Sequence, residues 1–139
     1  MRLVLDTNTV VSGLLWQGLP GKLIDAAQEK SVSLYTSALL LAELRGVLER
    51  AKFARQLESR GLDVVTIFDG FAALASIVTP AIITPTVAND PADDSVLACA
   101  LAAQADLIVS GDTHLLGLKT YHGIPIVTAA EALLRLSPR

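Results

Sequence analysis

The feature that most constrains the fold is an alternation of short apolar runs with longer helical segments. The apolar runs have the length and composition of buried strands, and they lie at 2–6, 31–37, 77–79, 106–112 and 124–127. Segments with helical spacing or helix-start signals separate them, at 19–30, 38–50, 52–60, 63–76, 93–105 and 128–136. Such alternation favours a mainly parallel sheet covered by helices. We therefore predict the α/β class, as a three-layer α/β/α sandwich.

The chain has 139 residues, which suits one compact domain, and no linker or repeat divides it. We expect a single domain over residues 1–139. A single cysteine, Cys99, excludes an intramolecular disulfide and a zinc cluster built on cysteines. The sequence shows neither a signal peptide nor an apolar run of 18 residues, so we expect no membrane contact and a cytoplasmic location.

The charge of the chain is low but unevenly distributed. A formal net charge of −3 argues against a strongly basic nucleic-acid binder. Residues 45–60 nevertheless contain five of the eleven basic residues. This stretch could form a local basic surface, or it could be an ordinary solvated helix face.

Four carboxylates stand where a parallel sheet would present a binding site. Asp6 and Asp112 each end a predicted strand, and Asp94 lies in the first turn of helix 93–105. Glu43 lies at the border of the apolar stripe of helix 38–50. Ligands bind outside the carboxyl ends of parallel strands, where the crossover helices also begin. We therefore expect all four acids at one rim of the sheet. Taken alone, each aspartate could cap a turn or a helix, and Glu43 could be a solvated helix residue.

Such a cluster is costly without a cation. Two carboxylates about 4 Å apart repel by roughly 4 kcal/mol at an effective dielectric constant near 20. Either some of them are protonated or a cation holds them together. Because the four groups offer only oxygen atoms, Mg²⁺ or Mn²⁺ is the expected ion.

Three blocks of the sequence resemble the PIN-domain ribonucleases, a family that includes many toxins of prokaryotic toxin–antitoxin systems. The blocks occur in order and are spread over nearly the whole chain: LVLDTNTVVSGL, TSALLLAEL and DPADDSVLACALAAQADLIVSGDTHLL. The resemblance implies a PIN-like fold and a Mg²⁺- or Mn²⁺-dependent endoribonuclease that cleaves single-stranded RNA. It also implies the role of a toxin, with an antitoxin protein or a second copy of the chain as partner.

The resemblance implies a role for each acid. Asp6, Asp94 and Asp112 would hold one or two cations, while Glu43 would orient or deprotonate the attacking water. Asp93, the residue directly before Asp94, could be a helix cap or could help to bind a second metal ion.

Polar and basic residues near the acids complete the expected site. Asn8 and Ser110 match positions where the family keeps polar residues, and they would orient the carboxylates. The basic stretch would guide the RNA backbone, and its candidate contacts are Arg45, Arg50, Lys52 and Arg55. His114 could touch the substrate, or it could be a surface residue of a turn.

Two other classes of function compete with the ribonuclease. One is a catalytically silent PIN-like module that binds RNA or protein, against which the four mutually repelling acids weigh. The other is a phosphatase of the haloacid-dehalogenase type, which needs a second aspartate two residues after the first. The chain has Asn8 at that position, so the phosphatase is disfavoured.

Overall fold

The computed structural model describes residues 1–87 and 90–136 and contains one central sheet. Along the sheet the strands are ordered β3-β2-β1-β4-β6-β5. All neighbouring strands pair in parallel except β5 and β6, which are antiparallel. The strands are β1 (Arg2–Leu5), β2 (Ser33–Thr36), β3 (Ser76–Ile77), β4 (Leu107–Val109), β5 (Thr120–Tyr121) and β6 (Ile124–Val127).

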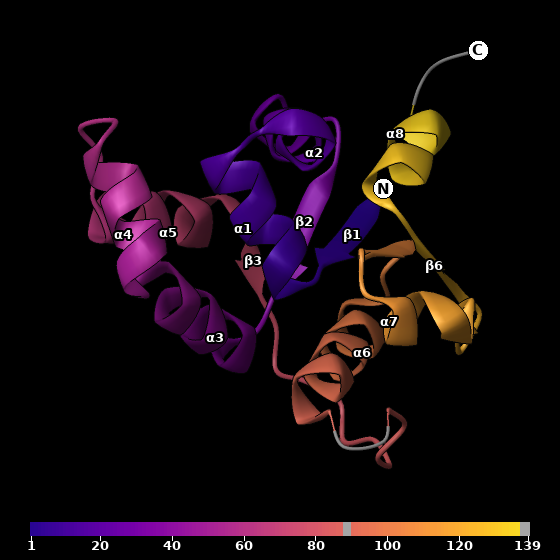
Figure 1. Cartoon of the computed structure of the whole chain (residues 1–139). Helices are drawn as coiled ribbons and strands as arrows, with labels where there is room; N and C mark the ends of the chain where they lie inside the picture. Colours follow the sequence, from indigo (N-terminus) through magenta and orange to yellow (C-terminus); the bar gives the residue numbers. More distant parts are fainter. Residues whose placement is uncertain (88–89, 137–139) are drawn as a thin grey trace.

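Helices cover both faces of this sheet, which confirms the predicted three-layer α/β/α sandwich. They are α1 (Thr7–Leu15), α2 (Gly18–Gln28), α3 (Ala38–Leu48), α4 (Ala51–Glu58), α5 (Val64–Leu74), α6 (Pro91–Ala103), α7 (Thr113–Leu118) and α8 (Ala129–Leu136). In Figure 1, α1 and α2 lie on one side of β1 and β2, and α6 and α7 lie on the other. None of the helices in the described parts of the chain combines the length and apolar character needed to cross a membrane.

Alternation along β1 divides the core into two parts. Leu3 and Leu5 point into a cluster formed with α1 to α5 and α8. Val4, between them, points to the opposite face and joins the cluster formed with α6. Successive strand residues face opposite sides of a sheet, so a strand covered on both faces is apolar at every position. The helix α6 is buried on most of its surface, as its composition indicates.

Hydroxyl groups cap two helices at the starts predicted from sequence. The Leu40 amide donates to the Ser37 hydroxyl oxygen at 3.3 Å, at the start of α3. The Glu131 amide donates to the Thr128 hydroxyl oxygen at 3.3 Å, at the start of α8. These caps lie just past the carboxyl ends of β2 and β6, and the loops after β1 and β4 end at the same rim.

The structure differs from the sequence-based expectation in three elements. Helix α1 was not predicted, because its β-branched residues have a low helix propensity; packing against α2 and α3 stabilises it. Helix α6 begins at Pro91 rather than at Asp93, since Asp90 caps it and proline suits the first helical position. The edge strand β5 was also missed. Of the predicted loop 80–92, residues 88–89 lie outside the described residues.

Candidate metal centre

Asp6 is held rigidly at the end of β1. One carboxylate oxygen accepts the Thr9 amide at 2.9 Å, which makes Asp6 the N-cap of α1. The other oxygen accepts the hydroxyl of Ser110, which follows β4. Asp6 is only 6% exposed. Its orientation is therefore fixed by backbone and hydroxyl donors, without a basic side chain.

Asp112 is fixed in the same way at the end of β4. Its Oδ1 atom accepts the amides of His114 at 2.7 Å and Leu115 at 3.2 Å, so it caps α7. The Asp112 amide in turn donates to the hydroxyl oxygen of Ser110 at 2.9 Å. Ser110 thus links the carboxylate of Asp6 to the backbone of Asp112.

Asp93 approaches these two acids from the first turn of α6. Its side chain is 8% exposed, and its Oδ2 atom is buried with no hydrogen-bond donor among the described residues. Burial, together with the negative charges of Asp112 and Asp90, raises the pKa of Asp93 to about 7. An unpartnered carboxylate oxygen that faces other carboxylates is the arrangement a cation would stabilise.

A small cleft brings the acids of three layers together. It is lined by Asp6 after β1, Glu43 from α3, Asp93 from α6 and Asp112 after β4, with Asn8 at its edge. Its volume of about 30 Å³ exceeds the roughly 10–15 Å³ that a water molecule requires. The cleft therefore has room for a small cation bound directly by the carboxylates, and its charged groups are the hard oxygen donors that Mg²⁺ and Mn²⁺ prefer.

The structure places Asp94 away from this cleft, contrary to the expectation that it joins the other acids. Its Oδ1 accepts the amides of Val87 at 2.9 Å and Thr86 at 3.1 Å, and Oδ2 lies 3.3 Å from the same Thr86 amide. Asp93 shares the buried face of α6 with Val96 and Leu97, three and four residues further on, and therefore faces the cleft at the carboxyl ends of the strands. Of the four acids selected from sequence, Asp6, Glu43 and Asp112 line the cleft, and Asp94 braces the loop before α6.

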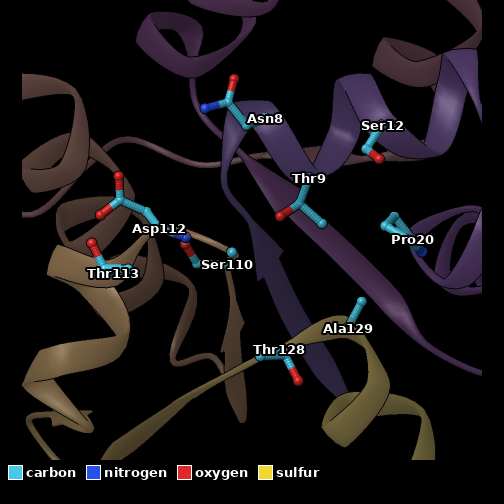
Figure 2. Close-up of a pocket in the computed structure, with 10 residues that line it drawn as sticks. Asn8, Thr9, Ser12, Pro20, Ser110, Asp112, Thr113, Thr128 and Ala129 are labelled. Atoms are coloured by element: carbon cyan, nitrogen blue, oxygen red, sulfur yellow. The ribbon is translucent and has the colours of Figure 1, made fainter.

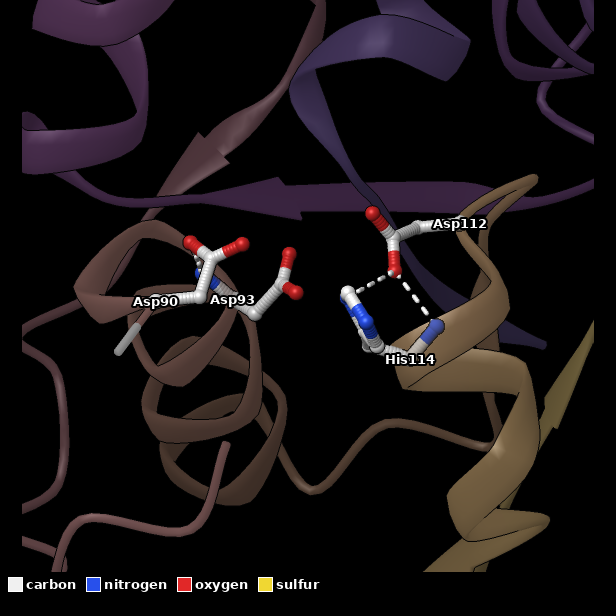
Figure 3. A group of neighbouring side chains, drawn as sticks. All are labelled: Asp90, Asp93, Asp112 and His114. Carbon is white, nitrogen blue, oxygen red and sulfur yellow. Dashed lines mark hydrogen bonds and ion pairs between the residues drawn. The ribbon is translucent and has the colours of Figure 1, made fainter. Parts of the chain in front are cut away.

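Two further groups stand beside Asp93 and Asp112. The ligand atoms of Asp90, Asp93, Asp112 and His114 all lie within 4.8 Å of one another (Figure 3). Asp90 caps α6 by accepting the Asp93 amide at 3.3 Å. Sequence reasoning missed Asp90 as part of the cluster. The pair Asp90-Pro91 is a helix-start signal that would have located it.

The basic stretch lies outside the cleft. Arg45 pairs with Glu49 at 3.8 Å and stacks over the Phe68 ring, and Lys52 stacks over the Phe53 ring. The exposed residues Arg50 and Arg55 complete the predicted set. None of these four basic residues lines the cleft, so their contact with RNA stays a prediction.

A larger groove adjoins the cleft. Figure 2 shows Asn8 and Ser12 of α1 facing Thr113 and Thr128 across it, with Asp112 at one side. The groove has a volume of about 540 Å³, and Asn8 and Asp112 line both cavities. The groove is therefore continuous with the acidic cleft, and its polar lining consists mainly of hydroxyl groups.

Comparison with known proteins agrees with this architecture. A family model described as a PIN domain matches residues 2–114, a range that contains all the acids of the cleft. The uncharacterized protein MJ1680 of Methanocaldococcus jannaschii is 30% identical to the chain over 122 residues. That alignment covers 86% of this chain and 76% of the relative.

Proposed function

This chain belongs to the PIN domain family, and from that membership and the acidic cleft we propose that it is a divalent-metal-dependent nuclease that hydrolyses single-stranded RNA. The observation that carries the proposal is the buried Asp93 oxygen, which has no donor within residues 1–87 and 90–136 and stands among the carboxylates of Asp112, Asp90 and Asp6. A buried polar atom without a partner is costly, and a divalent cation would remove that cost.

Three carboxylates would hold the cation. Asp6, Asp93 and Asp112 come from three separate elements and line one cleft. Asp6 and Asp112 are already oriented by amide and hydroxyl donors, so little rearrangement is needed to bind an ion. A bound divalent cation would supply Lewis acidity, which stabilises negative charge on the phosphate oxygens and lowers the pKa of water.

Glu43 and Asn8 would act on the reactants. Glu43 lines the cleft from α3 and is only partly buried, so its carboxylate can orient the attacking water and accept its proton. Asn8 is exposed at the start of α1, where its amide can donate a hydrogen bond to a phosphate oxygen. Both roles require that the scissile phosphate lie at the mouth of the cleft.

The adjoining groove could bind a nucleotide strand. Its hydroxyl groups, including those of Ser12, Thr113 and Thr128, can hydrogen-bond to phosphate or ribose. A nucleotide strand lying there would bring the next phosphate to Asn8 and Asp112, the residues shared with the cleft. The basic residues between 45 and 60 would then contact more distant phosphates, and binding would weaken as salt is added.

The test is cleavage of a labelled single-stranded RNA, with a DNA strand of the same sequence as comparison. We expect cleavage of RNA in Mn²⁺ or Mg²⁺, none in EDTA, and none by Asp93→Asn. The neighbouring variant Asp94→Asn is the matched control and should retain activity. Equal activity of Asp93→Asn and the wild type would reject the assigned site. A wild type that binds RNA without metal and never cleaves it would favour the silent module instead.

We also propose that the chain acts as the toxin of a toxin–antitoxin pair, on the basis of the sequence resemblance. An antitoxin protein or a second copy of the chain would then be its partner. Induced expression in a bacterial host should arrest growth with the wild type and with Asp94→Asn, and not with Asp93→Asn. Normal growth with a folded, RNA-cleaving wild type would remove the toxin role and leave the nuclease intact.

A further inference from the structure

We propose that the exposed ring of Trp16, at the end of α1, is a stacking platform for a base of the single-stranded RNA, and that basic residues of α4 and its ends hold the neighbouring phosphates. The inference rests on the proposed function only in taking RNA as the ligand. None of the residues concerned lines the acidic cleft.

Trp16 is the only tryptophan of the chain, and it lies at the surface. Its exposed fraction is 53%, and among the large apolar side chains exposed within residues 1–87 and 90–136 it is the only aromatic one. Its amide donates to the Ser12 carbonyl at 2.9 Å, which makes Trp16 the C-cap of α1. One exposed apolar side chain is ordinary by itself. The groups around this one point to a ligand.

A second aromatic ring holds the indole in place. The ring centroids of Trp16 and Phe53 are 5.7 Å apart at an interplanar angle of 72°, which is a favourable edge-to-face contact. Phe53 belongs to α4 and is partly buried, so the pair connects α1 with α4. The contact restrains the tilt of the indole and leaves about half of the side chain open to water. An incoming base would therefore meet a ring that is already oriented.

Positive charge surrounds the two rings. Lys52 Nζ lies 4.8 Å from the centroid of the Phe53 ring, and the Arg60 guanidinium donates to the carbonyl of Leu15, the last residue of α1. Residues 50–60 contain four basic side chains and one acidic one, although the whole chain has a net charge of −3. None of the three ion pairs in the described parts of the chain uses a residue of this range. Their charge is therefore available to a phosphate backbone.

The combination of aromatic rings and unpaired cations fits single-stranded nucleic acid. Such a strand presents flat bases and one negative charge at each phosphate, and proteins bind it with aromatic side chains inside a positively charged groove. A protein partner seated on this face would have to supply several acidic groups to pair the cations. Charge complementarity therefore favours RNA as the occupant.

Helix α1 connects the platform with the metal centre. Asn8 and Ser12 line the groove beside the cleft, and Trp16 follows Ser12 at the same interval of four residues. Residues four apart are neighbours on the surface of a helix, and eight residues of helix span about 12 Å. A strand that reaches from the mouth of the cleft to Trp16 therefore needs only a few nucleotides.

The fluorescence of Trp16 tests the platform directly, because the chain has no other tryptophan. The probe is an oligouridylate of about ten nucleotides, a length within the range of single-strand binding sites. It is added to the protein in EDTA, so that it is not cleaved. We expect the RNA to quench the Trp16 emission, and a strand of equal length without bases to leave the emission unchanged. Unchanged emission with RNA, or an equal response to the strand without bases, would overturn the inference.

Variants separate stacking from charge, with the anisotropy of the labelled oligouridylate in EDTA as the measurement. Trp16→Ala should weaken binding about tenfold, and Trp16→Phe, which keeps a flat ring, should stay within about threefold of the wild type. Lys52→Gln should reduce the slope of log affinity against log salt by about 0.7 for a lost phosphate contact. Leu134→Ala, at a side chain of α8 that is 76% exposed, is the control and should match the wild type. Equal affinity of Trp16→Ala and the wild type would contradict the platform.

Cleavage kinetics keep this inference distinct from the proposed function. In Mn²⁺, Trp16→Ala should raise KM about tenfold and leave kcat unchanged, because the platform binds substrate and transition state alike. Cleavage by a wild type whose Trp16 emission ignores RNA would remove the platform and leave the nuclease. Quenching in EDTA without cleavage in Mn²⁺ would remove the nuclease and leave the platform. Emission that responds to protein concentration instead of RNA would make this face a contact between copies of the chain, and would overturn the inference.

Discussion

Asp93 and Asp94 are neighbours in the first turn of α6, yet their carboxylates have opposite surroundings. Asp94 accepts the amides of Thr86 and Val87 and fixes the loop that precedes the helix. Asp93 is buried among other acids, with one oxygen that no donor in the described parts of the chain reaches. Consecutive residues are about 100° apart around a helix, which is enough to turn one side chain to the rim of the sheet and the other away.

Asp93 and Asp94 illustrate two different roles of an aspartate in a folded protein. A carboxylate that is supplied with amide donors stabilises the local fold. A buried carboxylate without donors destabilises the empty protein, and such a group is retained where a ligand compensates for it. In the metal-free protein, Asp93 therefore lowers the stability of the fold and Asp94 does not. The two residues can be tested as a pair.

The largest difference should appear in RNA cleavage. Asp93→Asn removes a charged ligand and should lower the cleavage rate at least about 100-fold, more than the loss of a group that only orients a ligand. Asp94→Asn should remain within a fewfold of the wild type. The measurement is the initial rate of cleavage of one labelled RNA in Mn²⁺. If both variants lose activity equally, the two residues do not differ as the structure indicates.

The second-largest difference between the Asp93 and Asp94 variants should appear in their stabilisation by bound metal. Mn²⁺ at about 100 times its dissociation constant stabilises a protein by about 2.7 kcal/mol, which corresponds to a rise in Tm of roughly 5–10 °C for a chain of this size. The wild type and Asp94→Asn should show this rise, and Asp93→Asn should show little of it. The check is thermal unfolding followed by circular dichroism, with EDTA as the control. A full rise in Asp93→Asn would contradict the assigned ligand.

A pH effect should follow from the titration of Asp93. Its pKa is about 7 in the folded chain, against an ordinary pKa of 3.8 for an aspartate. Between these values the folded state binds more protons than the unfolded state, so the free energy of unfolding falls as pH rises from about 4 to about 7. We expect the metal-free wild type to lose more than about 1 kcal/mol relative to Asp93→Asn over this range. Urea unfolding at pH 5 and pH 8 in EDTA measures the difference, and parallel curves would contradict it.

Much of the fold and part of the site could be predicted from the sequence. The apolar runs located the strands other than β5, and parallel pairing brought Asp6, Glu43 and Asp112 to one rim. Asp93 could not be separated from Asp94 by composition, because α6 is apolar on nearly every side and its sequence does not mark the face that packs on the sheet. Likewise, α1 is stabilised by contacts with α2 and α3 that its β-branched sequence does not reveal.

The smallest effect should lie in the stability of the loop that Asp94 braces. Asp94→Ala removes the acceptor of the Thr86 and Val87 amides and should lower the free energy of unfolding by about 1–2 kcal/mol. Asp94→Asn keeps one amide oxygen and should cost about half as much. Val87 is buried, so hydrogen exchange at its amide should accelerate in Asp94→Ala more than exchange at Val109 of β4. Unchanged exchange at Val87 would mean that the loop is held by other contacts, and the contrast between the two aspartates would then rest on Asp93 alone.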